Sequence, residues 1–181
     1  MNQVRFSIRP PANLLRLLCL LCALSAGAYT WIEGERPDRL PQSLRQESGF
    51  EEVMGGKGYA YEGWGRTQII SGGSMLHVNW KPAQVDKFLP EEGLIFGYDF
   101  TVVEGGAHSI WLRLAYSFAR SDFDWRLDGG QWRTCESTDF AVNMQSLKIW
   151  CCLQWLKLDT VRFEPGKHTV EFRLSRQTRL N

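Results

Sequence analysis

Three glycine-containing turn signals between residues 103 and 167 constrain the fold of this chain more than any other feature. Each lies between stretches in which apolar and polar residues alternate. The signals are Val103-Glu104-Gly105-Gly106, Leu127-Asp128-Gly129-Gly130 and Glu164-Pro165-Gly166-Lys167. Gly-Gly, Asp-Gly and Pro-Gly dipeptides supply the positive or preset φ that a tight turn requires. The pattern therefore predicts an all-β fold, an antiparallel β-sandwich or jelly roll.

The expected strands follow from the alternation and from the turns between them. They are 29–33, 67–71, 74–80, 94–103, 109–116, 123–127, 131–135, 154–163 and 167–174, the last two forming a hairpin. Polar and glycine-rich composition predicts loops between them. These loops are residues 34–65, with one helical turn near Phe50–Met54, residues 82–92 and residues 136–149. Loops as long as the first are commonly functional or disordered.

The first 28 residues have the pattern of a secretory signal peptide. Arg5, Arg9 and Arg16 precede the uncharged run Leu17–Ala26, and Ala26-Gly27-Ala28 fits an A-x-A cleavage site. A membrane anchor is the alternative, but the run is shorter than the roughly 20 residues of a transmembrane helix. We expect cleavage after Ala28, a mature chain without a membrane span, and a location outside the cytoplasm, secreted, periplasmic or at the cell surface.

Charge and length limit the mature chain further. The whole chain has 21 Lys+Arg and 20 Asp+Glu, so loss of the three leader arginines leaves 18 against 20, a net charge of −2. No clustered basic region indicates a nucleic-acid partner. Residues 29–181 suffice for one domain. Three cysteines remain, and we expect Cys135, Cys151 and Cys152 to be free thiols in preference to a bridge between Cys135 and one of the others.

Residues that could support catalysis are few. The chain has three histidines, His77, His108 and His168, and none has a second His or Cys at metal-ligand spacing. A Ser-His-Asp triad has no fixed order in sequence, so the fold could still assemble one. The sequence favours a non-catalytic protein.

The tryptophans separate by context. Trp111 and Trp125 lie within predicted strands, where packing against a sheet is expected. Tyr61, Trp64 and Trp150 lie in or beside polar loops, where aromatic side chains more often form contact surfaces. A flat indole can stack on the C–H face of a sugar, and Asp139 and Asn143 could bind its hydroxyl groups. Anchoring of these loops to the core is the alternative interpretation.

Several segments together resemble galactose-binding-like β-sandwiches, in particular carbohydrate-binding modules of families 6 and 35. The similar segments are Ile32-Glu33-Gly34-Glu35, Tyr98-Asp99-Phe100-Thr101-Val102, Trp111-Leu112-Arg113, Phe123-Asp124-Trp125-Arg126-Leu127-Asp128-Gly129 and Val161-Arg162-Phe163-Glu164-Pro165-Gly166-Lys167-His168-Thr169. The resemblance spans about residues 29–175. It implies a module that binds a polysaccharide or other glycan, with Trp64 and Trp150 at the positions that best fit its binding aromatics.

The resemblance also implies a structural calcium ion. The first-strand glutamates of these modules often help to hold it, which would make Glu33 and Glu35 the ligands here. A further acidic ligand usually comes from a final strand, and no such strand is visible after Leu174. Two other functions stay open: the recognition domain of a truncated polysaccharide-degrading enzyme, and a structural or adhesion domain that binds protein.

Overall fold

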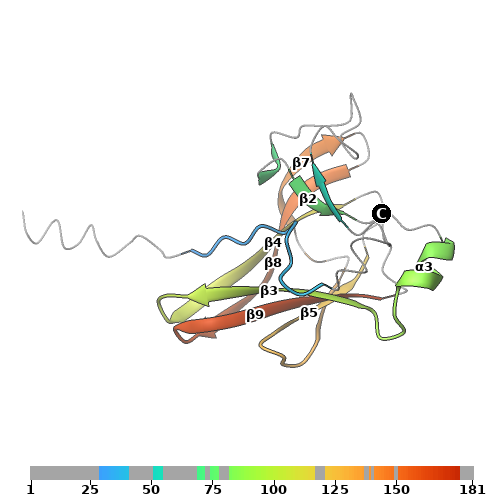
Figure 1. Cartoon of the computed structure of the whole chain (residues 1–181). Helices are drawn as coiled ribbons and strands as arrows, with labels where there is room; N and C mark the ends of the chain where they lie inside the picture. Colours follow the sequence, from blue (N-terminus) through green and yellow to red (C-terminus); the bar gives the residue numbers. More distant parts are fainter. Residues whose placement is uncertain are drawn as a thin grey trace, which may run out of the picture.

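The computed structural model describes residues 29–40, 51–54, 69–71, 74–77, 82–116, 121–136, 139, 141–148 and 151–175. Its elements are antiparallel strands and one short helix (Figure 1). In chain order they are β1 (Glu51–Met54), β2 (Ser74–His77), α3 (Pro82–Phe88), β3 (Leu94–Val102), β4 (Gly106–Tyr116), β5 (Phe123–Leu127), β6 (Arg133–Cys135), β7 (Ala141–Lys148), β8 (Cys151–Phe163) and β9 (Gly166–Leu174). The predicted leader lies outside the described residues.

Two sheets make up the body of the protein. One has four strands in the order β3-β9-β5-β6, and the other has three in the order β4-β8-β7; β1 and β2 form a separate pair. Tyr98, Trp125 and Phe172 of the four-stranded sheet share a core with the completely buried Leu156 of the other sheet. The predicted all-β sandwich is therefore confirmed.

One long antiparallel ribbon, formed by β3 and β4 paired with β9 and β8, contributes two strands to each sheet. β3 pairs with β9 from Leu94↔Leu174 to Val102↔Gly166, and β4 pairs with β8 from Gly106↔Phe163 onward. Because β3 continues into β4 and β8 into β9, the ribbon bends between its two halves. Figure 1 shows β4 and β8 leaving the bend at an angle to β3 and β9.

This bend explains why one sequence prediction was wrong. Gly106 and Gly166 begin the strands after the bend with φ of 144° and 148°, a region that favours glycine. A Cβ on Gly105 would lie 2.9 Å from Cδ of Pro165, so the two chain segments cross closely here. The turns near 105 and 165 are therefore corners between sheets, and β8 and β9 do not form the expected hairpin.

The remaining turn signal, Leu127-Asp128-Gly129-Gly130, does form a hairpin. Asp128 and Gly129 have φ of 50° and 67°, as a type I′ turn requires, and the Gly130 N–H donates to the Leu127 carbonyl oxygen over 2.8 Å. The turn joins β5 to β6, which are paired neighbours. Asp, like Asn, tolerates a positive φ, and this is why Asp-Gly is common in such turns.

Five local predictions need correction. Residues 29–33 are not a strand, and the described part of the predicted strand 67–71, residues 69–71, is not a strand either. Residues 51–54 form β1 where a helical turn was expected, and the predicted loops 82–92 and 136–149 contain α3 and β7. Pro82 is the first residue of α3, a position that proline favours. Val85, Phe88 and Leu89 then recur at helical spacing and pack with Leu94. β7 has irregular register and a positive φ at Asn143, which obscures its alternation.

The segment 29–40 follows the edge strand β3. Arg39 and Gly97 exchange backbone hydrogen bonds of 3.1 Å, and the Tyr98 hydroxyl donates to the Gly34 carbonyl oxygen over 2.6 Å. The Asp99 N–H donates to Oδ2 of Asp38 over 2.8 Å. The segment therefore satisfies part of an edge that would otherwise expose unpaired backbone groups.

Candidate binding face on the three-stranded sheet

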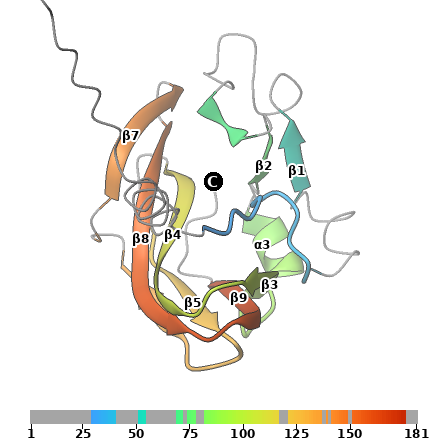
Figure 2. The same ribbon diagram turned by 90° about the vertical axis from the view of Figure 1, so that its left-hand side faces the viewer.

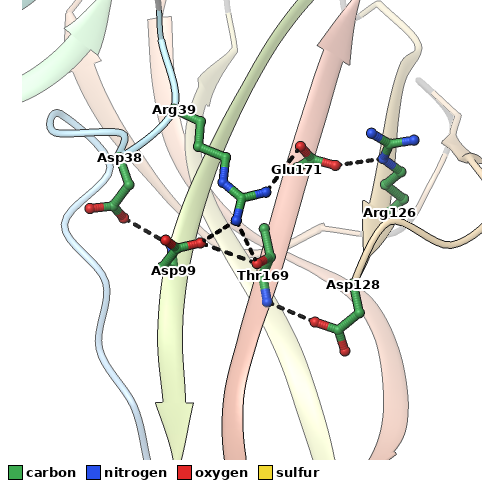
Figure 3. Close-up of polar contacts among 7 residues, drawn as sticks. All are labelled: Asp38, Arg39, Asp99, Arg126, Asp128, Thr169 and Glu171. Atoms are coloured by element: carbon green, nitrogen blue, oxygen red, sulfur yellow. Dashed lines mark hydrogen bonds and ion pairs between the residues drawn. The ribbon is translucent and has the colours of Figure 1, made fainter.

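The outward side chains of the four-stranded sheet form what we call the charged face. Its members, from β3, β9 and β5, are Asp99, Thr169, Glu171, Arg173, Asp124 and Arg126. Arg39 reaches this face from segment 29–40 and donates to Oδ1 of Asp99 over 2.9 Å and to Thr169 Oγ1 over 3.1 Å (Figure 3). It also lies 3.5 Å from Oε1 of Glu171.

The remaining arginines of the charged face are paired too. Arg126 Nε donates to Oε2 of Glu171 over 2.6 Å, and Arg173 donates to Oδ2 of Asp124 over 2.7 and 3.0 Å. Both guanidinium groups lie against the Trp132 ring, 4.3 and 4.5 Å from its centroid. Each of these arginines therefore has a carboxylate partner within the protein.

The outward side chains in the middle of the three-stranded sheet differ from those of the charged face. Figure 2 shows its strands β7, β8 and β4 side by side. Leu112 and Leu156 point to the core, so their neighbours Trp111 and Arg113 on β4, and Trp155 and Lys157 on β8, point away from it. We call these four residues the aromatic face. Trp111 is 45% exposed.

The register arranges the aromatic face as a checkerboard. Trp111 lies opposite Lys157, and Arg113 lies opposite Trp155. Directly opposed residues in an antiparallel pair have Cβ atoms about 4.5–5.5 Å apart, and diagonal neighbours about 7–8 Å. Each indole therefore adjoins a cation across the strands, and the two tryptophans occupy one diagonal.

Arg113 is held in place within this arrangement. Its guanidinium lies 5.6 Å from the Trp155 ring centroid, and its Nη2 donates to Oε1 of Gln145 over 3.2 Å. A cation at this distance is attracted by the ring quadrupole. Lys157 is exposed, and its side chain has the freedom to follow a ligand.

A third tryptophan extends the aromatic face from segment 29–40. The Trp31 and Trp155 ring centroids are 5.7 Å apart with an interplanar angle of 72°, and Trp31 is 49% exposed. Oε1 of Glu33 accepts hydrogen bonds of 2.8 Å from Trp31 Nε1 and from Ser71 Oγ. Glu33 therefore positions the Trp31 indole beside Trp155.

The histidines of the two corners have structural roles. Nε2 of His108 lies 2.9 Å from the Glu104 carbonyl oxygen, and Nε2 of His168 lies 2.9 Å from that of Glu164. Nδ1 of His168 is also 2.8 Å from Oδ2 of Asp128. The bond to Asp128, then that to the Glu164 carbonyl, raises the pKa of His168, because both oxygens accept hydrogen bonds from the protonated imidazolium and so favour its charged form.

Of the five residues that the sequence proposed for sugar binding, the structure describes two. Tyr61, Trp64 and Trp150 lie outside the described residues. Asp139 is exposed before β7, where its Oδ2 accepts a 3.0 Å bond from the Glu136 N–H, and Asn143 is exposed within β7. They come from different elements, and their part in binding stays a prediction.

The mid-strand tryptophans also differ from each other. Trp125 is 3% exposed and packs in the core as expected, whereas the expectation that Trp111 packs against a sheet was wrong. The missed signal was the alternation itself. Trp111 shares its side of β4 with Arg113 and not with Leu112, and Trp155 shares its side of β8 with Lys157.

The described residues do not assemble a calcium site around the two predicted ligands. Residues 34–35 form a turn, so the shared side of a strand does not apply to Glu33 and Glu35, and Glu35 is buried at 6% exposure. Within the described ranges no three His, Cys, Asp or Glu side chains gather as a metal site. Calcium stays a prediction, which a calcium-dependent rise in melting temperature would support.

The fold thus places this protein in the class of all-β sandwich proteins and does not identify a family within that class. Comparisons with family models, with curated proteins and with solved structures find no significant match.

Among the described residues no helix has the length and hydropathy to cross a membrane. Cys135, which is buried, and Cys152 do not form disulfide bonds, as expected.

Proposed function

We propose that this protein is a non-catalytic carbohydrate-binding module that acts outside the cytoplasm. The observation that carries the proposal is the aromatic face, where Trp111 and Trp31 remain about half exposed beside Trp155. Burying such rings on folding would stabilise the protein, so a group of them left at the surface indicates contact with a partner. A sugar ring offers a C–H face that stacks on indole and hydroxyl groups that bind nearby polar side chains.

The resemblance to galactose-binding-like sandwiches supports the same function, and the leader supports its location. The finer fold assignments, the jelly roll and the galactose-binding-like family, are part of this proposal. The described site differs from the one expected from the loops, because it lies on strands β4 and β8. Strand side chains are held more rigidly than loop side chains, which lowers the entropic cost of binding.

Affinity electrophoresis in gels that contain individual polysaccharides tests the proposal. We expect Trp111→Ala and Trp31→Ala to lose most retardation, because losing a flat stacking contact costs about 1–3 kcal/mol by analogy with bases on aromatic side chains. Trp132→Ala is the matched control, since Trp132 belongs to the opposite side of the sandwich. Equal retardation of wild type, Trp111→Ala and Trp31→Ala would contradict the proposal.

A further inference from the structure

We infer that the aromatic face binds an anionic polysaccharide, one whose sugar rings carry carboxylate or sulfate groups. The inference rests on the proposed carbohydrate binding and adds the chemical class of the ligand. Its basis is the placement of cations among the tryptophans of this face. Neutral sugars need stacking rings and hydrogen-bonding groups, whereas the checkerboard supplies a positive charge next to each of its indoles.

The cations of this face and the adjoining Arg162 lack the carboxylate partners that the arginines of the charged face have. Among described residues, no carboxylate lies within ion-pair distance of Arg113 or Lys157. The same holds for Arg162, which points outward further along β8. On the charged face, Arg39, Arg126 and Arg173 each pair with a carboxylate.

Overall charge does not explain this difference. Without the three leader arginines the chain has 18 basic and 20 acidic side chains, so carboxylates are numerous enough to pair with every cation. The nearby Glu33 uses Oε1 for Trp31 and Ser71, and Asp159 on β8 pairs with Arg133. These hydrogen bonds leave Glu33 charged, but Arg113, Lys157 and Arg162 outnumber it, and this excess of positive charge favours an anionic partner.

The geometry suits a sugar that carries an anionic substituent. A ring stacked on Trp111 would extend its substituents over Lys157, and one stacked near Trp155 would meet the Arg113 guanidinium. Guanidinium binds carboxylate and sulfate through paired N–H groups, and Gln145 already orients it. Successive charged sugars along a chain would then meet successive cations along the strands.

The test measures binding of the folded protein to polygalacturonate, dextran sulfate and neutral dextran, with variants Arg113→Gln and Lys157→Gln. We expect binding to one of the anionic polymers, weakened about fivefold or more by each variant and by added salt. Carboxylate and sulfate ligands are distinguished by which polymer binds. Lys167→Gln is the matched control, because it removes one exposed lysine from the outward side of the other sheet.

Several results would overturn the inference. They are equal loss of binding in Lys167→Gln, unchanged binding in both aromatic-face variants, or equally strong binding to anionic lipid vesicles or polynucleotides. Binding to a neutral polymer alone, lost in Trp111→Ala, would overturn the anionic class and leave the proposed function intact. Polymer binding that Trp111→Ala does not affect would instead contradict the proposed function.

Discussion

The two outward faces of this sandwich contain similar residues but differ in whether their cations are paired with carboxylates. Both carry arginine and tryptophan, but on the charged face the two arginines that lie against Trp132 also bind Asp124 and Glu171. The aromatic face leaves Trp111 45% exposed, and its cations have no carboxylate partner among the described residues. The comparison teaches that the pairing of charges, more than residue type, separates a surface that stabilises the fold from one suited to a ligand.

The largest expected effect concerns the two mid-strand tryptophans. Trp125→Ala should lower the free energy of unfolding by about 3–5 kcal/mol, because it empties a packed core site. Trp111→Ala should cost about 1 kcal/mol or less, as exposed substitutions do. Urea denaturation of both variants measures this difference. Similar losses of stability would show that Trp111 has a packing role and would remove the basis of the comparison.

The charged face should contribute stability and not binding. Glu171 is 8% exposed and contacts both Arg126 and Arg39. Glu171→Gln should therefore cost about 1–3 kcal/mol of unfolding free energy, since it leaves polar groups poorly satisfied. Polysaccharide retardation should not change. Lys157→Gln is the reciprocal variant: it should reduce retardation, with an unfolding free energy within about 0.5 kcal/mol of wild type. Loss of retardation in Glu171→Gln together with loss of stability in Lys157→Gln would contradict the division between the two faces.

A smaller effect should appear in the pH dependence of stability at the corner beside Gly166. The pKa of His168 is raised in the folded state by Asp128 and the Glu164 carbonyl oxygen. A raised folded pKa stabilises the protein fully below the unfolded pKa of about 6.5, and this contribution is lost as pH rises through the folded value.

The measurement compares unfolding free energies of wild type and His168→Gln from pH 5 to 9. The wild type should lose its advantage over the variant as pH rises. The corresponding His108→Gln variant is the control, because no carboxylate contact is described for His108. A constant difference between wild type and His168→Gln would show that the imidazolium does not contribute.

The smallest predicted change tests how Glu33 positions Trp31. Two indoles 5.7 Å apart at 72° should give an exciton signal in circular dichroism. Glu33→Ala removes the acceptor of the Trp31 N–H and should weaken that signal, whereas Glu33→Gln keeps an acceptor and should preserve most of it. A signal equally strong in Glu33→Ala and wild type would mean that Glu33 does not orient the ring.

Sequence alternation sufficed to predict the strands of the ribbon, because residues such as Phe172 and Leu156 recur with period two on the buried side. It did not reveal that two of the three turns are corners. Glu104-Gly105-Gly106 and Glu164-Pro165-Gly166 have the local chemistry of hairpin turns, and which sheet a strand joins depends on partners far away in sequence.

The candidate site was predictable only in part. Loop position directed attention to Tyr61, Trp64 and Trp150, which lie outside the described residues. Trp31 and Trp155 meet because segment 29–40 follows β3, a long-range arrangement that no local pattern encodes. The exposure of Trp111 was accessible in principle, since its strand neighbours of the same parity are Arg113 and Ser109.

The most direct test of the account is a titration observed through the indole N–H resonances of the eight tryptophans, with each assigned by substitution. The ligand is the polysaccharide fragment that binds best in affinity electrophoresis. We predict saturable shifts for Trp31, Trp111 and Trp155, with Trp125 and Trp132 unchanged. Shifts centred on Trp132, or saturable binding that leaves the resonances of Trp31, Trp111 and Trp155 in place, would contradict the assignment of binding to the aromatic face.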